Sequence, residues 1–197
     1  EFGMYVSFDD GERWQPLQLN LPATPITDLA VHQQDLVVAT QGRGYWILDD
    51  LTPLHQLGRE VATADAHLFQ PRPSYRMDGG TPRRRSYMSS DRWMAGRIER
   101  HRVADNPPSG AVIFYSFADT PDDEVTLEIL DATGESIRSF SSSNDGDAVA
   151  TQPGINRFVW DLVYPGADII PGGRFDGYAG GPRALPGSYE VRLSTGD

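Results

Sequence analysis

The stretch "ITDLAVHQQDLVVATQGRGYWILDD", residues 26–50, decides the fold class of this chain. Its three apolar runs, at 26–32, 35–40 and 44–50, are separated by links of two or three residues. Such short links favour antiparallel neighbours in a meander. Runs such as LVVA and YWIL are apolar on both faces. We therefore expect these strands to be packed between neighbouring sheets.

The same strand-and-turn pattern continues along the rest of the chain. Glycine (20) and proline (15) are abundant among the 197 residues, as suits many short strands joined by turns. Further strands are predicted at 3–8, 13–19, 111–118, 124–131, 135–141, 155–162 and 188–193, with a tight turn at 131–135. The sequence therefore predicts an all-β protein of two modules, the second an immunoglobulin-like β-sandwich.

Composition excludes several classes of function. Asp and Glu (28) exceed Lys and Arg (17), and the net charge of −11 argues against a nucleic-acid partner, which needs a basic face. Cysteine is absent, which excludes disulfides and thiolate metal sites. No run approaches the ~18 apolar residues of a membrane span. No signal-peptide pattern opens the chain, so any export signal is expected upstream of residue 1.

A basic segment stands out in this acidic chain. Residues 72–102 hold nine arginines against three acidic residues. The segment could dock on the acidic surface of its own chain, form a solvated loop or bind an external anion, because opposite charges attract wherever they are presented. We favour docking on its own chain.

Residues 7–14, "SFDDGERW", fit the pattern Ser-x-Asp-x-Gly-x-x-Trp. Asp9 can accept hydrogen bonds from the backbone N–H groups of a turn, and Gly11 can take a positive φ. Trp14 is expected to bury its ring against a neighbouring sheet. A calcium loop needs oxygen ligands at alternating positions, and only part of that pattern exists here. The stretch is therefore interpreted as a structural hairpin corner that begins at Ser7.

This pattern is the Asp-box, and residues 1–54 resemble the last repeats of bacterial sortilin-like, BNR-repeat β-propeller proteins of the "glycosyl hydrolase-like" kind. The segments "NPPSGAVIFYSF", "VTLEILDATGESIRSF", "PGINRFVWDL" and "ALPGSYEVRL" are similar to the sandwich that follows the propeller in those proteins, of flagellar hook-capping type. The resemblance implies that Ser7, Asp9, Gly11 and Trp14 form a structural box on an outer turn, away from the substrate face. It also implies a secreted, periplasmic or cell-surface location.

The resemblance implies a division of the chain into three parts. Residues 1–57 are expected to form one to two incomplete blades at the end of a propeller. Residues 58–110 are expected to be a linker with the Arg-rich irregular segment, including a first sandwich strand near 66–76. Residues 111–197 would form the sandwich without its last strand. We therefore expect a fragment of a longer protein, whose open edges are covered by the remaining blades or by another copy.

No catalytic residue, metal ligand or cofactor is assigned from the sequence. The four histidines lie at least 12 residues apart and form no metal motif. Adjacent acids on a strand point to opposite faces, so the paired carboxylates cannot flank one glycosidic bond. Asp49 and Asp50 follow an inner strand and are candidates for a site shared with other blades, or are plain turn residues.

Three aromatic residues are further binding candidates. Tyr164, Phe175 and Tyr178 lie in or beside the Gly/Pro-rich segment 165–186. Their rings could stack on a sugar or a peptide, although core packing or cover for a sheet edge is the simpler interpretation.

Three functional hypotheses remain open. The favoured one is a non-catalytic interaction or scaffold fragment of a larger BNR-repeat propeller protein, because no convergent set of acid, base or nucleophile is present. The alternative is the C-terminal portion of a glycoside hydrolase, sialidase- or xyloglucanase-like, with its catalytic residues mostly upstream. A weaker alternative is a carbohydrate-binding sandwich. The expected partners are the remaining propeller blades or another copy of the chain, and a protein or glycan ligand.

Overall fold

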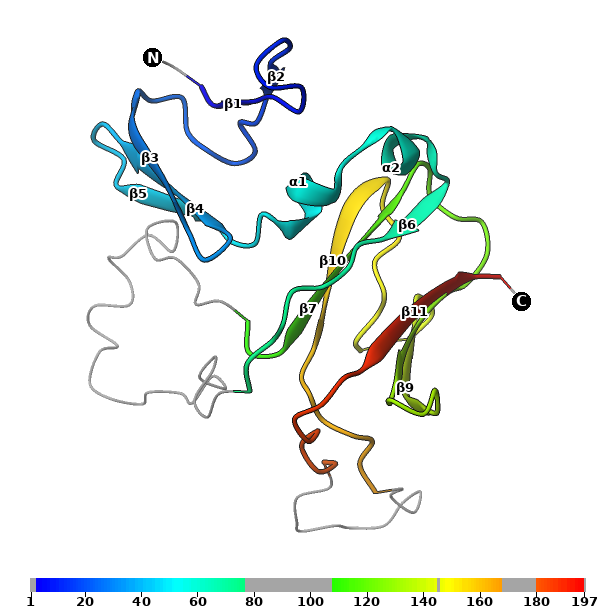
Figure 1. The fold of residues 1–197 in the computed structure, drawn as a ribbon. Coiled ribbons are helices and arrows are strands. Elements are labelled where there is room, and N and C mark those ends of the chain that lie inside the picture. The colour runs from blue at the N-terminus through cyan, green and yellow to red at the C-terminus, as the bar shows by residue number, and fades with distance from the viewer. Residues whose placement is uncertain (1–2, 77–107, 145, 168–179, 197) are drawn as a thin grey trace, which may run out of the picture. The chain divides into compact units, whose positions relative to one another are not determined.

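The computed structural model describes residues 3–76, 108–144, 146–167 and 180–196. The described chain is all-β apart from two short helices, as the sequence predicts. It divides into two compact units, Glu1–Gln56 (unit 1) and Leu57–Asp197 (unit 2), and the strands of each unit form antiparallel sheets (Figure 1). Neither described helix is long or apolar enough to cross a membrane.

Unit 1 contains a two-stranded and a three-stranded sheet. The three-stranded sheet confirms the meander predicted for residues 26–50, in the order β3-β4-β5. Its strands, and those of the small sheet, are β1 (Tyr5–Val6), β2 (Gln15–Pro16), β3 (Ile26–His32), β4 (Asp35–Thr40) and β5 (Tyr45–Leu48).

The link between β3 and β4 is a two-residue turn. Gln33 and Gln34 both have positive φ, 49° and 72°. A turn with two positive φ values matches the right-handed twist of the strands on either side, which is why it closes a hairpin tightly. Unit 1 ends with α1 (Thr52–Gln56), which follows β5 directly.

Unit 2 contains two three-stranded sheets, with orders β10-β7-β6 and β11-β8-β9. It begins with α2 (Arg59–Thr63), in a region predicted to be an irregular connection ending in a strand. That strand is present but short. The strands are β6 (Ala66–Leu68), β7 (Ala111–Phe117), β8 (Val125–Leu130), β9 (Ser136–Ser141), β10 (Gly154–Trp160) and β11 (Glu190–Thr195).

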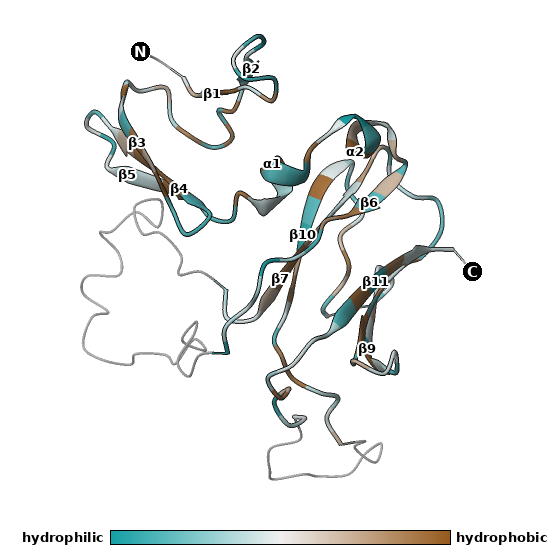
Figure 2. Cartoon of the chain, in the orientation of Figure 1, coloured by the Kyte–Doolittle hydropathy of each residue, from teal (hydrophilic) through white to brown (hydrophobic). Residues whose placement is uncertain are grey.

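The two sheets of unit 2 share one hydrophobic core. Side chains at alternate positions of each strand face it, because successive residues of a strand point to opposite faces. An alternation of hydrophilic and hydrophobic residues is visible along β11 (Figure 2). The core side chains include Ile113, Tyr115 and Phe117 of β7, Val125, Leu127 and Ile129 of β8, Phe140 of β9, and Phe158 and Trp160 of β10.

Two polar groups of aromatic residues in this core are hydrogen-bonded. The Tyr115 hydroxyl donates to the carbonyl oxygen of Ala150 at 2.9 Å. The buried Trp160 donates from Nε1 to the carbonyl oxygen of Val163 at 3.3 Å. Its ring meets that of Tyr189 edge to face, with centroids 5.2 Å apart. A buried donor without a partner would cost about 1–3 kcal/mol, so these bonds allow bulky polar rings in the core.

Candidate functional site

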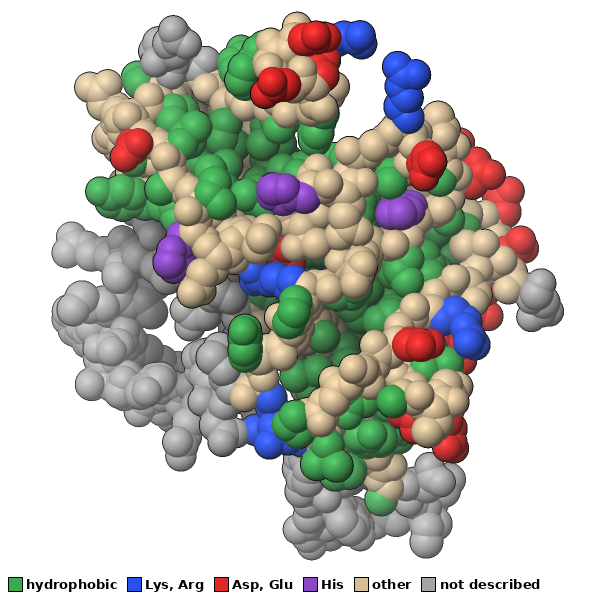
Figure 3. Space-filling view, viewed as in Figure 1, with side chains coloured by type: hydrophobic (Ala, Val, Ile, Leu, Met, Phe, Trp, Pro, Cys, Tyr) green, Lys and Arg blue, Asp and Glu red, His purple; other side chains and the backbone are tan. Residues whose placement is uncertain are grey.

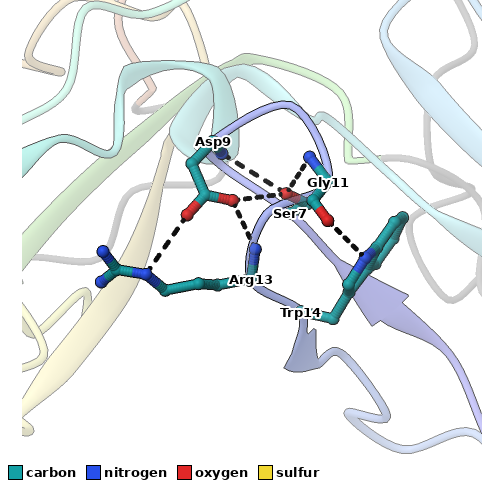
Figure 4. Close-up of polar contacts among 5 residues, drawn as sticks. All are labelled: Ser7, Asp9, Gly11, Arg13 and Trp14. Atoms are coloured by element: carbon teal, nitrogen blue, oxygen red, sulfur yellow. Dashed lines mark hydrogen bonds and ion pairs between the residues drawn. The ribbon is translucent and has the colours of Figure 1, made fainter.

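The predicted Asp-box folds as a hairpin corner between β1 and β2 (Figure 4). The Ser7 hydroxyl oxygen accepts a hydrogen bond from the Gly11 amide at 2.8 Å and donates to Asp9 Oδ1 at 2.9 Å. The same Asp9 oxygen accepts from the Arg13 amide at 2.8 Å. The role predicted for Asp9, an acceptor for backbone N–H groups of the turn, is therefore confirmed.

Gly11 has the backbone conformation expected of it. Its φ is +91°, a region that a Cβ would make unfavourable. The preceding residue, Asp10, also has a positive φ of 58°. Aspartate tolerates this left-handed conformation better than most residues. The two acidic residues of the box therefore serve two different needs of one turn.

The burial expected for Trp14 is not found in the described chain. The residue is 63% exposed, and its Nε1 donates to the carbonyl oxygen of Gly11 at 3.1 Å (Figure 4). The indole thus binds its own turn. Burial of a ring this large needs a second layer of residues, which short β1 and β2 do not supply.

Arg13 was not singled out from the sequence. Its amide is the donor to Asp9, and its Nε lies 3.6 Å from Asp9 Oδ2. Because this hydrogen bond is donated by a backbone N–H, any residue except proline could donate it at this position. A motif defined by side chains therefore does not reveal it. With both Asp9 oxygens facing these groups, the carboxylate is engaged in the turn.

Asp49 and Asp50 lie at the end of β5, where the sequence places them. Asp50 is buried, with a positive φ of 64°. Its amide donates to Asp35 Oδ1 at 2.9 Å, and its Oδ1 accepts from the Thr52 amide at 3.0 Å, at the start of α1. The local geometry is that of a turn residue. Asp35 is the partner that sequence reasoning missed, because it lies 15 residues away.

The remaining candidates divide between described and undescribed residues. Tyr164 is partly buried against the core of unit 2 and lines a pocket there. Phe175 and Tyr178 lie outside the described residues. Most of the Arg-rich segment does too, although the described Arg76 donates from Nη1 to the carbonyl oxygen of Ala184 at 3.0 Å. Within the described ranges, no group of three or more His, Cys, Asp or Glu residues is placed to hold a metal ion.

Large apolar side chains are exposed on the three-stranded sheet of unit 1. The exposed fractions are 51% for Leu29, 66% for Val31, 80% for Tyr45 and 59% for Ile47. Figure 3 shows hydrophobic side chains gathered on the visible face over the strands of this unit. Leu29 is paired with Val38, which is paired with Trp46, so these side chains share one face of the sheet. Ile47 is paired with Val37, the neighbour of Val38, so its side chain projects from the other face.

Comparisons with models of protein families, with curated proteins and with solved structures each found no match for this chain. The likeness to BNR-repeat propeller proteins therefore stays a prediction that rests on the motifs themselves.

Proposed function

We propose that unit 1 is a non-catalytic interaction module that packs against further β-sheets, as the end of a β-propeller packs against its neighbouring blades. The observation that carries the proposal is the exposure of Leu29, Val31, Tyr45 and Ile47 on one small sheet. Burying a side chain of this size is favourable by about 1.5–3 kcal/mol. Covering both faces of the sheet would therefore contribute substantially to binding.

The arrangement of these side chains fits a sheet with neighbours on two sides. Leu29 and Val31 share one face of β3, and Tyr45 and Ile47 share the opposite face of β5. Strands of a sheet that has one face on a core and the other in solvent alternate apolar and polar residues. Blades of a propeller are instead covered by a blade on each side. The partners that fit are the remaining blades of a longer chain or a second copy.

The acidic residues of unit 1 support a structural role over catalysis. Asp9 of the Asp-box and Asp50, a binding candidate from the sequence, both accept backbone hydrogen bonds in turns. A glycosidase needs two carboxyl groups that face one bond across a cleft. We therefore expect no hydrolysis of neutral or sialylated glycans by this chain, and turnover of either class would favour the alternative of a glycoside hydrolase.

Self-association of the chain tests the proposal. In the absence of other blades, the two apolar faces should pair with those of a second copy, so light scattering after size exclusion should show a mass that rises with concentration. Val31→Lys and Ile47→Lys, which charge opposite faces, should each lower that mass and the binding of an apolar dye.

Leu185→Lys is the matched control, because Leu185 is an equally exposed apolar residue of unit 2. It should leave the association unchanged. A chain that stays monomeric at every concentration and binds no dye, or one whose association responds only to the control substitution, would refute the proposal.

A further inference from the structure

A pocket of ≈ 620 Å³ opens at one edge of unit 2. It lies between β9, an edge strand of one sheet, and the segment that follows β10 of the other sheet. This volume is within the range of small-molecule sites, about 300–1,000 Å³. Its lining includes Arg138 and Ser139 of β9 and, after β10, Asp161, Val163 and Tyr164.

Arg138 is held in this pocket by three groups. Its guanidinium carbon lies 4.7 Å from the centroid of the Phe140 ring, its Nη1 donates to the carbonyl oxygen of Val163 at 3.3 Å, and the same nitrogen is 3.7 Å from Asp161 Oδ1. The side chain is only 24% exposed. An arginine fixed in this way loses little conformational freedom when it binds a ligand, which favours affinity.

Arg138 lies beside an irregularity of the sheet. Along β9 the pairing with β8 shifts, so that Arg138 is opposite Ile129 while Ser136 is opposite Leu130, and Ile137 is the extra residue. β-Bulges redirect side chains and occur often beside binding sites. Arg138 itself lies next to the bulge, opposite Ile129, so its side chain is on the same face of the sheet as this buried residue.

Asp161 supplies the complementary acceptor. Its Oδ1 accepts a hydrogen bond from the Val163 amide at 3.1 Å, which fixes the carboxylate beside Arg138. The side chain is 61% exposed, so it remains accessible to a ligand. Guanidinium donates and carboxylate accepts, and the pair has no net charge. This pair therefore suits adjacent hydroxyl groups, each of which both donates and accepts, better than it suits an anion.

Tyr164 adds an aromatic residue to the lining. Its amide donates to the carbonyl oxygen of Pro182 at 2.8 Å, and it packs against the core of unit 2. The Tyr164 hydroxyl is hydrogen-bonded to that of Tyr189, and burial together with this bond raises the pKa of Tyr189. A fixed aromatic ring is a suitable surface for the C–H face of a sugar, because its π face is electron-rich.

We propose that this pocket binds a neutral sugar ring, with Arg138 and Asp161 hydrogen-bonded to adjacent hydroxyls and Tyr164 against the ring. The proposal is independent of the function proposed for unit 1, since every residue it uses belongs to unit 2. It gives the candidate Tyr164 two partners that were not singled out from the sequence, Arg138 of β9 and Asp161 of its own segment.

Titration of the full 197-residue chain with sugars tests the proposal. The probes are glucose, galactose, mannose, xylose and cellobiose, with glucuronate and sialic acid as the carboxylated arm. We expect at least one neutral sugar to bind with a dissociation constant of millimolar or lower, and to shift the amide signals of Ser139, Val163 and Tyr164 in NMR spectra. The carboxylated sugars should bind at least tenfold more weakly.

Asp161→Asn keeps an oxygen for the Val163 amide and removes the charge, so it should fold normally and weaken binding at least tenfold. Tyr164→Leu should weaken it as well. The matched control is Arg192→Gln, which breaks the 3.5 Å ion pair between Arg192 of β11 and Glu128 of β8. This pair does not line the pocket, so the substitution should not change binding. Binding of no neutral sugar, a preference for the carboxylated sugars, or equal affinity in Asp161→Asn and wild type would each overturn the proposal.

Discussion

At the scale of single residues, three of the described aspartates shape turns. Asp9 accepts from the Arg13 amide, Asp50 from the Thr52 amide, and Asp131 from the Thr133 and Glu135 amides at 2.8 and 3.1 Å. The hydrogen bonds of Thr133 and Glu135 hold the pKa of Asp131 below its usual value. A short acidic side chain reaches the amides two to four residues ahead, which explains why acidic residues recur at strand ends.

Replacing Asp9 should loosen the Asp-box hairpin. Asp9→Ala removes the carboxylate that accepts hydrogen bonds from the Arg13 amide and the Ser7 hydroxyl. Each of these hydrogen bonds contributes about 0.5–1.5 kcal/mol. Amide exchange at Gly11 and Arg13 should therefore become about tenfold faster. Asp10→Asn, which keeps a residue that tolerates positive φ, is the control and should leave these rates unchanged. Equal effects of the two substitutions, or slower exchange on adding millimolar calcium, would show that the corner is not organised as described.

Tyr115 should make the stability of unit 2 sensitive to alkali. Burial raises the pKa of Tyr115 to about 12. An unfolded tyrosine titrates near 10, so the stabilisation is complete below pH 10 and is lost as the pH rises to 12. A difference of two pKa units corresponds to about 2–3 kcal/mol.

Tyr115→Phe removes this titration and the hydrogen bond to Ala150. The variant should be about 1 kcal/mol less stable at pH 7, and its stability should fall less than that of the wild type between pH 10 and 12. Denaturant unfolding at a series of pH values measures both. Tyr45→Phe, at an exposed tyrosine, is the control. A variant with the same alkaline decline as the wild type would contradict the assignment to Tyr115.

At the scale of elements, the two three-stranded sheets of unit 2 differ from the sheet of unit 1. On β7, Ile113, Tyr115 and Phe117 alternate with less buried neighbours, because the strand has a core on one side. On β3, every residue after Ile26 is exposed. Large apolar side chains occur in both strands, and those of β3, Leu29 and Val31, are nevertheless exposed. Burial therefore depends on what each sheet packs against, and strand sequence alone does not decide it.

The start of β7 should not tolerate a side chain at Gly110. Its φ is +149°, and an added Cβ would overlap the carbonyl oxygen of Trp160, whose residue pairs with Ala111. Gly110→Ala should therefore destabilise the chain by about 2–4 kcal/mol, since β7 and β10 must separate to admit the methyl group. Thermal or denaturant unfolding measures the loss.

Gly187→Ala is the matched control, because an added Cβ at Gly187 meets no atom within 4 Å. This variant should retain nearly wild-type stability. Similar stability of the two variants would mean that the pairing of β7 with β10 is looser than described.

At the scale of the whole molecule, the two units differ in how much apolar surface each buries by itself. In unit 2 one cluster of buried side chains draws on four strands, β7 to β10, and on Val149 and Ala184 outside the strands. In the described part of unit 1 the buried apolar side chains include Met4, Val38 and Leu51, one each from separate segments. Because burial of apolar surface is the main favourable term in folding, unit 1 should be the less stable of the two.

Hydrogen exchange of the full chain measures this difference directly. Amides in β4, the central strand of unit 1, should exchange at least a hundredfold faster than amides in β7 and β8, which are central strands of unit 2. The comparison is between strands hydrogen-bonded on both sides, so edge effects do not contribute. Equal protection of β4 and β7 would show that the small sheet is as stable as the large core, and that its exposed side chains have no need of a partner.

The sequence by itself determined the features that depend on neighbouring residues. The strands at 26–32 and 35–40, the turn between them, and the roles of Asp9 and Gly11 all follow from side-chain period and local hydrogen bonds. The tertiary structure alone decided which of these elements are covered. It leaves Trp14 and Val31 exposed, and it brings Arg138 of β9 together with Asp161 of the segment after β10. The physical reason is range: hydrogen bonding and backbone preference act over a few residues, whereas burial and ion pairing depend on segments that only folding brings into contact.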